Sequence, residues 1–482
     1  MSGLAGKVKN GLQWTTVSTL GRALIQIAQL SVAAHYLSAT ELGIYALVQL
    51  CLGFCQMYMD MGVGQAIIHQ QNMPDRHYSE LFVVNFLLTS LLAVIVFSTA
   101  PALAWSFDTP ALSEYLQVMC LSFFIAALGR IHLVALQKEL VFSVLAKIEL
   151  FAVLMGFLLT FGLLVQGMGL YSLVAGYLFN LLLQTLLAWI YSPLRVRICW
   201  PHSWRALSHY LIFGAYQTTD ATVNYVNSHI DILLVGKLLG TEVLGGYSLV
   251  RQFCFRPAMI INQTVTRVAF PMLAKLQNSP KLGTIYCQLL SVLAAINFPL
   301  YVALFLLAEP IVTLIFGEKW LHLVPLFQLM SLWCLLRSAM NPVGSLLLAV
   351  GKVQLALKWN SLLLLFMPVS IYFGAGYGVE GVAVALLILQ IALIPGHWWF
   401  LLYQSAKVSF KEFIQSLMIP LILSAITGAF VMLGLNLLEN TNTLVELMLG
   451  LALGGVVYIS LSIKFNPKLI SVLKGNYQLE NE

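Results

Sequence analysis

The sequence predicts an all-α polytopic membrane protein with about 14 transmembrane helices, and three observations support this fold class. Hydrophobic residues make up 60% of the 482 residues, and charged residues only 9%. Apolar stretches of about twenty residues, the length at which a helix crosses ~30 Å of hydrocarbon, recur from end to end. Most lysines and arginines outside these stretches fall in alternate loops, which is the charge asymmetry that orients membrane proteins.

The predicted spans are distributed evenly along the chain. In order they are 13–35, 42–68, 80–104, 112–136, 143–166, 168–192, 210–237, 243–267, 286–308, 322–349, 353–375, 378–403, 413–436 and 443–464. The loop charges place the N-terminus in the cytoplasm, and an even number of spans returns the C-terminus to the same side. No short apolar region with a small-residue cleavage site precedes the first span, which is therefore expected to remain in the protein.

An internal repeat predicts two lobes. The segments Leu37-Ser-Ala-Thr-Glu-Leu42-Gly43-Ile-Tyr45 and Leu239-Gly-Thr-Glu-Val-Leu244-Gly245-Gly-Tyr247 share the pattern LxxxxLGxY at an offset of 202 residues. Six predicted helices separate the two copies, so the halves have parallel orientation. The expected organisation is an N-lobe of helices one to six (1–192), a cytoplasmic linker (193–209), a C-lobe of helices seven to twelve (210–403), and helices thirteen and fourteen with a cytoplasmic tail (404–482).

Polar residues follow one face of the first helix in each half. In span one they are spaced by three or four residues, as on one side of a 3.6-period helix: Thr15, Ser18, Arg22, Gln26 and Gln29. Span seven repeats the pattern with Gln217, Asp220, Asn224, Asn227 and Asp231, and spans two and eight add Gln56, Asp60, Gln252, Arg256 and Gln263. These faces are expected to turn away from lipid.

Five arginines lie inside the predicted spans, namely Arg22, Arg130, Arg251, Arg256 and Arg337. A charge at the bilayer centre costs roughly 2.5 to 3.5 kcal/mol on insertion scales, so such residues usually face a bundle interior or a hydrated cavity. Arg130 lies near the cytoplasmic end of its span and is equally explained by snorkelling to the interface. Single glutamines and asparagines on such faces often only hydrogen-bond to neighbouring helices.

The predicted substrate-binding residues are the other four arginines with four amides: Arg22, Arg251, Arg256, Arg337, Gln26, Gln29, Asn224 and Asn227. A guanidinium group recognises phosphate with paired hydrogen bonds, so this set predicts a carrier for an anionic amphiphile. The carboxylates Asp60, Asp220 and Asp231 are candidates for ion coupling, or else fixed partners of an arginine.

Other chemistry is not indicated by the sequence. The seven cysteines form no CxxC pair or Cys/His cluster with metal-ligand spacing, and no GxxxxGK[ST] phosphate loop occurs. We therefore expect no metal, no cofactor, no catalytic residue and no ATP hydrolysis. The positive charge is spread over short loops, so nucleic acid is not an expected partner.

An ordered series of short segments resembles the Wzx-type flippases of the polysaccharide transporter family, in particular the colanic acid exporter-like branch of the multidrug/oligosaccharidyl-lipid/polysaccharide superfamily. The segments are Asp60-Met-Gly62-Val-Gly-Gln-Ala-Ile-Ile68, Gln137-Lys-Glu-Leu140, Leu244-Gly-Gly-Tyr247, Thr266-Arg-Val-Ala-Phe-Pro271, Ile296-Asn-Phe-Pro299, Phe316-Gly-Glu-Lys-Trp320 and Leu336-Arg-Ser-Ala-Met-Asn-Pro-Val-Gly-Ser345. The resemblance covers most of the chain and fades over the last two spans.

This resemblance implies a V-shaped central cavity in the bacterial inner membrane that opens alternately to the two sides. The implied cargo is an undecaprenyl-pyrophosphate-linked oligosaccharide repeat unit, with the arginines meeting its pyrophosphate or acidic sugars. Implied partners are the polymerase and glycosyltransferases of the same pathway, and the implied coupling ion is H+ or Na+.

Two alternatives stay open. One is an ion-coupled multidrug exporter of the same superfamily, although an excess of intramembrane arginine would repel the cationic drugs that such carriers favour. The other is a membrane polysaccharide polymerase or ligase. Such enzymes generally carry a large periplasmic loop, whereas the longest outward loop here, around Glu309 to Leu321, is short.

Overall fold

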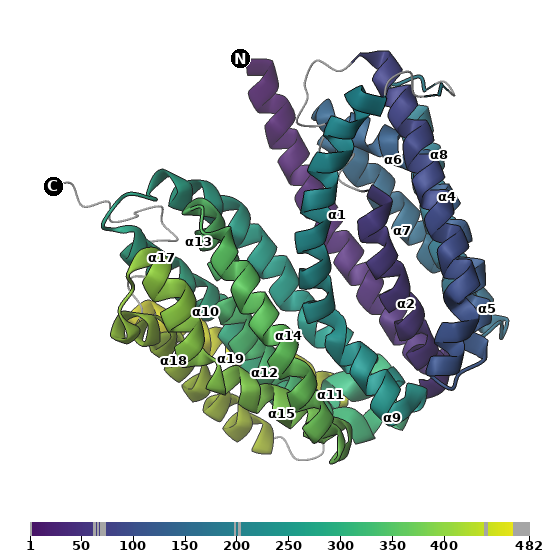
Figure 1. Cartoon of the computed structure of the whole chain (residues 1–482). Coiled ribbons are helices and arrows are strands. Elements are labelled where there is room, and N and C mark those ends of the chain that lie inside the picture. The colour runs from purple at the N-terminus through teal and green to yellow at the C-terminus, as the bar shows by residue number, and fades with distance from the viewer. Residues whose placement is uncertain are drawn as a thin grey trace. The chain divides into compact units, whose positions relative to one another are not determined.

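In a computed structural model of the chain, every regular element of the described residues is helical (Figure 1). The structure describes residues 2–60, 64, 67, 74–196, 199–200, 204–437 and 442–465, with backbone alone for 2–12, 60, 75, 204–221, 264, 267 and 268. By contacts between Cα atoms, the chain divides into two compact units, Met1–Ser248 (unit 1) and Leu249–Glu482 (unit 2). The repeat-based lobes divide the chain elsewhere and remain a prediction.

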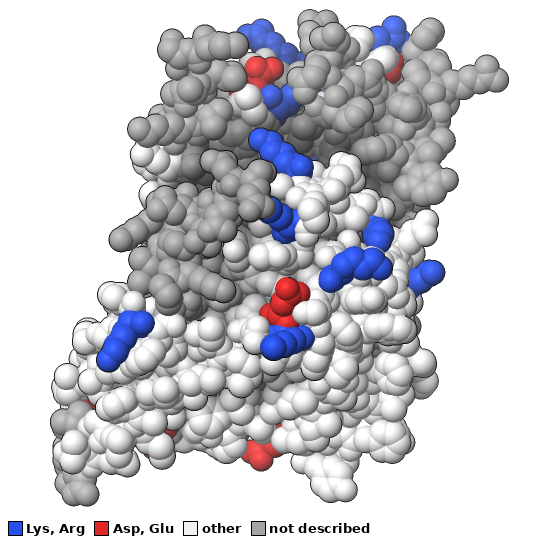
Figure 2. Space-filling view, turned by 90° about the vertical axis from the view of Figure 1, so that its left-hand side faces the viewer, with Lys and Arg blue, Asp and Glu red and all other residues white. Residues whose placement is uncertain are grey.

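Described helices overlap each of the fourteen predicted spans. Among the described residues, twelve helices are long and apolar enough to cross a membrane, and the bent pair Gly378–Ala392 and Ile394–Ala406 passes the same length and hydropathy test when taken together, as a broken span or a re-entrant loop. One of the twelve, Thr222–Gln263, is two helices joined at Gly240, where the backbone has a φ of 86°. This break falls between the predicted spans 210–237 and 243–267. Much of the described surface in Figure 2 belongs to uncharged residues, as lipid requires. The predicted fold class, an all-α polytopic membrane protein, is confirmed.

Unit 1 contains the helices from the N-terminus to the first part of α9. Their bounds are α1 (Ser2–Tyr36), α2 (Ala39–Asp60), α4 (Asp75–Ser106), α5 (Ala111–Met119), α6 (Leu121–Lys138), α7 (Phe142–Val165), α8 (Tyr171–Tyr191) and α9 (Trp204–Lys275), which continues into unit 2. Small residues let these helices approach closely: a Cβ atom on Gly176 of α8 would lie 1.8 Å from Oγ1 of Thr160 on α7. Such contacts hold α8 near its neighbours.

The two copies of the LxxxxLGxY repeat pack against each other within unit 1. A Cβ atom on Gly43 would lie 1.8 Å from the backbone oxygen of Thr241, and one on Gly245 would lie 1.9 Å from that of Ala39. Ala39 and Thr241 are separated by the same 202 residues as Gly43 and Gly245, so the two contacts are reciprocal. Reciprocal contacts of equivalent residues define a local pseudo-two-fold axis, as expected for a sequence repeat.

Unit 2 contains the second part of α9 and the remaining helices. Their bounds are α10 (Leu282–Leu306), α11 (Ala308–Ile311), a π-helical turn (Val312–Phe316), a 3₁₀ segment (Glu318–Leu323), α12 (Val324–Met340), α13 (Val343–Ala349), α14 (Val353–Ala375), α15 (Gly378–Ala392), α16 (Ile394–His397), a second π-helical turn (Trp398–Tyr403), α17 (Gln404–Ala406), α18 (Phe410–Asn436) and α19 (Thr443–Phe465).

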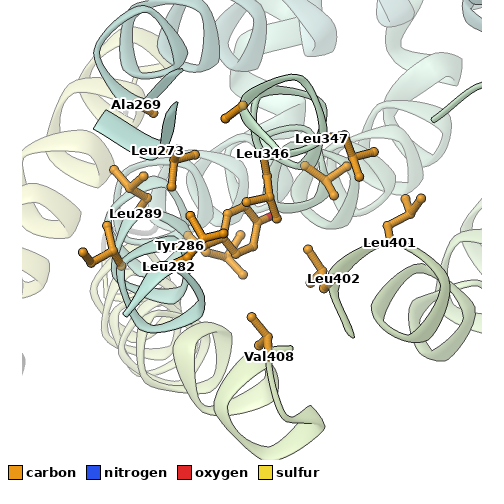
Figure 3. Close-up of a cluster of buried hydrophobic side chains, with 14 of the residues drawn as sticks. Ala269, Leu273, Leu282, Tyr286, Leu289, Leu346, Leu347, Leu401, Leu402 and Val408 are labelled. Carbon is orange, nitrogen blue, oxygen red and sulfur yellow. The ribbon is translucent and has the colours of Figure 1, made fainter. Parts of the chain in front are cut away.

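A buried apolar cluster joins the helices of unit 2 (Figure 3). Tyr286 of α10, Leu346 of α13 and Leu402 of the second π-helical turn contribute fully buried side chains to it. Residues of the last part of α9 and of the segment before α18 complete the cluster, among them Leu273 and Val408. Because Met340 of α12 also belongs to the cluster, the cluster packs against the end of α12 that carries Arg337, described below.

Candidate functional site

Two of the predicted arginines in unit 2 share one aromatic ring. The guanidinium carbon of Arg251 lies 4.5 Å from the centroid of the Phe255 ring, and that of Arg337 lies 5.2 Å from the same centroid. Arg337 also lies 5.2 Å from the Trp333 ring. The contacts follow from helical spacing, because Arg251 and Phe255 are four residues apart on α9, and Trp333 and Arg337 four apart on α12. We call these four residues the arginine–aromatic cluster.

The cluster concentrates positive charge where water is scarce. Arg251 is buried, with 7% of its surface exposed, and Arg337 is half-buried. Aromatic faces attract guanidinium groups, so both positive groups are held against the Phe255 ring. A guanidinium group donates paired hydrogen bonds to an anion that has two charged oxygens. Arg256 lies on the same helix, directly after Phe255, and is half-buried.

Arg22 has a counter-charge in unit 1. Its Nη1 lies 2.7 Å from Oε2 of Glu149, which joins α1 to α7, and both side chains are about one-third exposed. Gln26 is exposed on the same helix and Gln29 is half-buried. Arg22 was predicted to bind substrate. The ion pair with Glu149 offers a second role, in which Arg22 joins two helices. The sequence signal for the pair was Glu149, the one carboxylate in the predicted span 143–166.

The polar stripe of span seven is partly buried in unit 1. Asn224 is exposed, whereas Asn227 and Asp231 are 6% and 1% exposed. The hydroxyl of Tyr247 donates a hydrogen bond of 2.7 Å to Oδ2 of Asp231. Tyr247 is the last residue of the repeat motif, so a candidate coupling carboxylate is tied to the repeat turn. The side chains of the other two candidates, Asp60 and Asp220, lie outside the described residues.

A polar pocket of about 420 Å³ lies within unit 1, between α2, α4, α6 and α8. We call it the unit 1 pocket; its lining residues are Gln56, Met59, Asn85, Thr89, Ser122, Ala126, Ala127, Arg130, Leu133, Tyr177, Asn180, Leu181, Gln184 and Thr185. The sequence analysis placed Gln56 on a polar face and left Arg130 between two explanations. It did not single out the amides of α4 and α8.

Hydrogen bonds between helices shape this pocket. Nε2 of Gln56 on α2 donates to the hydroxyl of Tyr177 on α8 over 2.6 Å. Oγ1 of Thr185 on α8 donates to the backbone oxygen of Ile125 on α6 over 3.0 Å. The close approach of α6 and α8 needs Gly129, since a Cβ atom there would lie 2.5 Å from Thr185 Oγ1. These two hydrogen bonds thus join α8 to α2 and to α6 around the pocket.

The part of the chain that the structure describes holds no group of three or more His, Cys, Asp or Glu residues arranged to bind a metal ion. The polar chemistry of both regions comes instead from guanidinium, amide and hydroxyl groups.

The matching family model and two of the relatives that match this chain carry names that refer to biosynthesis. A family model described as "Polysaccharide biosynthesis protein" matches residues 32–325. The teichuronic acid biosynthesis protein TuaB of Bacillus subtilis (strain 168) is 30% identical over 485 residues, covering 98% of this chain and 99% of that protein. The lipopolysaccharide biosynthesis protein WzxC of Escherichia coli (strain K12) is 30% identical over 427 residues, covering 87% of this chain and 86% of that protein.

Solved structures share the fold at low sequence identity. The lipid II flippase MurJ in an inward closed conformation has a TM-score of 0.74 at 16% identity, covering 95% of this chain and 99% of its own. An inward-facing multidrug resistance MATE family transporter has a TM-score of 0.63 at 16% identity, covering 80% of this chain and 95% of its own. At such identities the likeness concerns the fold, and the site must be argued from its own residues.

Proposed function

Because this chain belongs to the polysaccharide biosynthesis protein family, we propose that it is a flippase that moves lipid-linked oligosaccharides from one leaflet of a membrane to the other. The observation that carries the proposal is the arginine–aromatic cluster of Arg251, Phe255, Trp333 and Arg337. Two guanidinium groups on one ring suit a headgroup with two adjacent phosphates, because each guanidinium can bind a phosphate through two hydrogen bonds.

The proposed cargo is an undecaprenyl-pyrophosphate-linked repeat unit that travels from the cytoplasmic to the periplasmic leaflet of the bacterial inner membrane. TuaB and WzxC are named for teichuronic acid and lipopolysaccharide biosynthesis, and MurJ is titled a lipid II flippase, which supports a lipid-linked cargo. In the proposed orientation both termini are cytoplasmic. Movement by alternating access would deliver the unit to the polymerase that follows the glycosyltransferases in the same pathway.

Coupling to an ion is proposed for a buried carboxylate, with Asp231 as the described candidate. Its side chain is 1% exposed and accepts a hydrogen bond from Tyr247 at the repeat turn. Protonation of a buried carboxylate removes a charge that is costly in a low-dielectric environment, so H+ is the simpler of the two proposed ions. Asp60 and Asp220 remain sequence-based candidates.

The two rival functions are disfavoured by different observations. A multidrug exporter for cations would bring its substrate against Arg251 and Arg337, which lie together on Phe255. A polymerase or ligase is disfavoured by the fold, which this chain shares with a lipid II flippase and with a multidrug resistance transporter. We therefore propose a transporter rather than an enzyme.

The proposal is tested by replacing Arg337 with Ala in cells that depend on this protein for surface polysaccharide. Lipid-linked repeat units are expected to accumulate on the cytoplasmic leaflet, with the variant present in the membrane at the wild-type level. Lys411→Ala removes one exposed positive charge from the start of α18 and serves as the matched control. Normal polysaccharide output from Arg337→Ala would refute the assignment of the cluster.

A further inference from the structure

A buried polar network lies beside the arginine–aromatic cluster in unit 2. It consists of Asn262 on α9, Asn297 on α10 and Ser338 on α12, each with 2% or less of its surface exposed. We propose that the two asparagines are positioning residues, which set the register of α12 against α9 and thereby hold Arg337 on the Phe255 ring. This inference rests on the proposed function, because it concerns the cluster to which the pyrophosphate group is assigned.

One hydrogen bond joins α9 to the part of α12 that carries Arg337. Nδ2 of Asn262 donates to the backbone oxygen of Ser338, the residue after Arg337, over 3.2 Å. In a regular helix this oxygen would accept a bond from the backbone nitrogen four residues later, but that residue is Pro342, which has no N–H. Asn262 therefore supplies a donor that the helical pattern does not provide, and the bond forms only at one alignment of the two helices.

The second asparagine fixes the orientation of the first. Nδ2 of Asn297 donates to Oδ1 of Asn262 over 3.2 Å. Because the backbone oxygen of Ser338 can only accept, it must face Nδ2 of Asn262, which leaves Oδ1 of Asn262 for Asn297. Oδ1 of Asn297 itself has no hydrogen-bond partner among the described residues, although the residue is fully buried. A buried acceptor without a partner lowers stability, so Asn297 is better explained by the alignment that it enforces than by stability.

Asn262 lies on the face of α9 that carries the shared aromatic ring. Phe255 precedes it by seven residues, or two helical turns, so both side chains lie on the same side of the helix. A second polar contact with α12 comes before the ring along the chain, where Sγ of Cys254 is 3.8 Å from Oγ of Ser331. The Phe255 and Trp333 rings, with centroids 5.3 Å apart, fall between the two contacts on both helices. A shift of α12 along α9 would therefore break both contacts and move the arginine of α12 away from the ring.

α10 supports this part of α9 at two points. Pro257 lies inside α9, five residues before Asn262, and a proline in a helix interior removes one backbone hydrogen bond and weakens the helix. On one side of Pro257, the hydroxyl of the fully buried Tyr301 donates to the backbone oxygen of Cys254 over 2.8 Å. On the other side, Asn297, four residues before Tyr301 and hence on the same face of α10, binds Asn262. The segment of α9 that carries the ring is thus held on both sides of the proline.

Polar contacts are needed here because apolar packing specifies an alignment poorly in a membrane. Lipid tails are as apolar as the side chains that face them, so helices gain little by burying one apolar residue rather than the next. A buried asparagine at a helix interface fixes the register of coiled coils, at a cost in stability. We expect the same effect of Asn262 between α9 and α12.

The first measurement is a cryo-EM structure of the full-length Asn262→Leu variant in lipid nanodiscs. Leucine has a similar size but removes the donor to Ser338. The guanidinium carbon of Arg337 is therefore expected to lie more than about 6 Å from the Phe255 centroid, beyond the range of attraction to the ring. Asn297→Ala, which keeps the donor but frees its amide to rotate, should give a smaller displacement and serves as the second variant if Asn262→Leu does not fold. A distance that stays at 5.2 Å would overturn the inference.

The second measurement is the affinity of the purified protein for inorganic pyrophosphate by titration calorimetry. Asn262→Leu should weaken binding about tenfold, the effect of losing one hydrogen bond to a charged group, because Arg337 no longer reaches the anion. In the Arg337→Gln background the same substitution should have no further effect, since residues that act through one another are not additive. An equal loss in both backgrounds, or no loss in the wild-type background, would contradict the inference, because a purely structural role does not depend on Arg337.

Gln328→Leu is the matched control. Nε2 of Gln328 on α12 donates to the backbone oxygen of Phe305 on α10 over 3.3 Å, and Gln328 lies about 13 Å from Arg337 along the helix. Its loss should lower the thermal midpoint and leave the position of Arg337 and the pyrophosphate affinity unchanged. An equal loss of affinity in this control would count against the inference. If the wild-type protein does not bind pyrophosphate while Asn262→Leu displaces Arg337, the positioning role stands and the proposed function fails.

Discussion

Single arginines inside this protein are held in three chemical environments. Arg22 is paired with a carboxylate, Arg251 and Arg337 lie on an aromatic ring, and Arg130 lines a pocket of amides and hydroxyl groups. An ion pair brings a negative charge beside the arginine, whereas an aromatic face attracts the guanidinium group without carrying a net charge of its own. Equal substitutions at these positions are therefore expected to have different consequences.

The pair between Arg22 and Glu149 is expected to contribute to stability. Glu149→Ala leaves a half-buried guanidinium without its counter-charge, and Arg22→Ala leaves the carboxylate, so each single variant should lower the temperature at which the detergent-solubilised protein aggregates. The double variant Arg22→Ala/Glu149→Ala should recover part of the loss. A purely substrate-binding Arg22 would instead give a stable single variant, with no recovery in the double variant.

Phe255 is expected to matter for transport through its ring. Phe255→Leu keeps an apolar side chain but removes the aromatic face that both Arg251 and Arg337 contact, and should reduce the translocation rate about tenfold. Phe255→Tyr retains the face and should preserve most of the rate. Equal rates in the Leu and Tyr variants would show that the ring does not position the arginines.

At the scale of helices, the sequence predicted the structure best where a single apolar pattern or a single repeated motif determined where a helix begins, ends or packs. The break in α9 at Gly240 separates spans that the apolar pattern had already divided, and the repeat that predicted equivalent turns also marks the glycines that pack against each other. The unit 1 pocket was harder to predict, because each of its helices contributes only a few polar residues. Asn85 and Thr89 on α4 meet the amides of α8 only through tertiary packing.

The reciprocal contact of the repeat turns is expected to tolerate no side chain. Gly43→Ala and Gly245→Ala each place a methyl group against a backbone oxygen less than 2 Å away, so the helices must separate. Overpacking of this kind typically costs about 1–3 kcal/mol, and each variant should lose its fold at a lower temperature than the wild type.

Gly162→Ala is the matched control for these two variants. It lies within α7, and a Cβ atom there meets nothing within 4 Å, so the substitution should be neutral or slightly stabilising. A thermal midpoint measured by size-exclusion chromatography after heating distinguishes the three variants. Loss of stability in Gly162→Ala equal to that in Gly43→Ala would contradict the importance of the turn contact.

At the scale of the whole molecule, the described spans and the family both agree with the sequence-based expectation of a multi-pass flippase fold. Composition and loop charge sufficed for the fold class because a lipid environment admits few alternatives to apolar helices. The same information does not assign roles to polar residues. Arg22 shows why: its place on a polar stripe was evident, but its partner on α7 is brought to it only by helix packing.

Ion coupling belongs to the whole transport cycle, and Asp231 offers a direct test of it. In Asp231→Asn the amide oxygen can still accept the hydrogen bond from Tyr247, so the fold should be retained, but the residue can no longer bind and release a proton. Translocation in vesicles should then lose its dependence on an imposed proton gradient. Tyr247→Phe keeps the carboxylate and should keep that dependence. Full gradient dependence in Asp231→Asn would exclude this residue as the coupling group.

The most direct measurement is translocation of a fluorescent lipid-linked oligosaccharide in vesicles that contain only this protein. A leaflet-selective quencher reports how much of the label remains outside, and chromatography of the extracted lipid reports its chain length. We predict that the label redistributes between the leaflets in a protein-dependent manner while its chain length stays unchanged. A label that stays in its original leaflet, or an oligosaccharide that becomes longer, would contradict the assignment of this protein as a flippase.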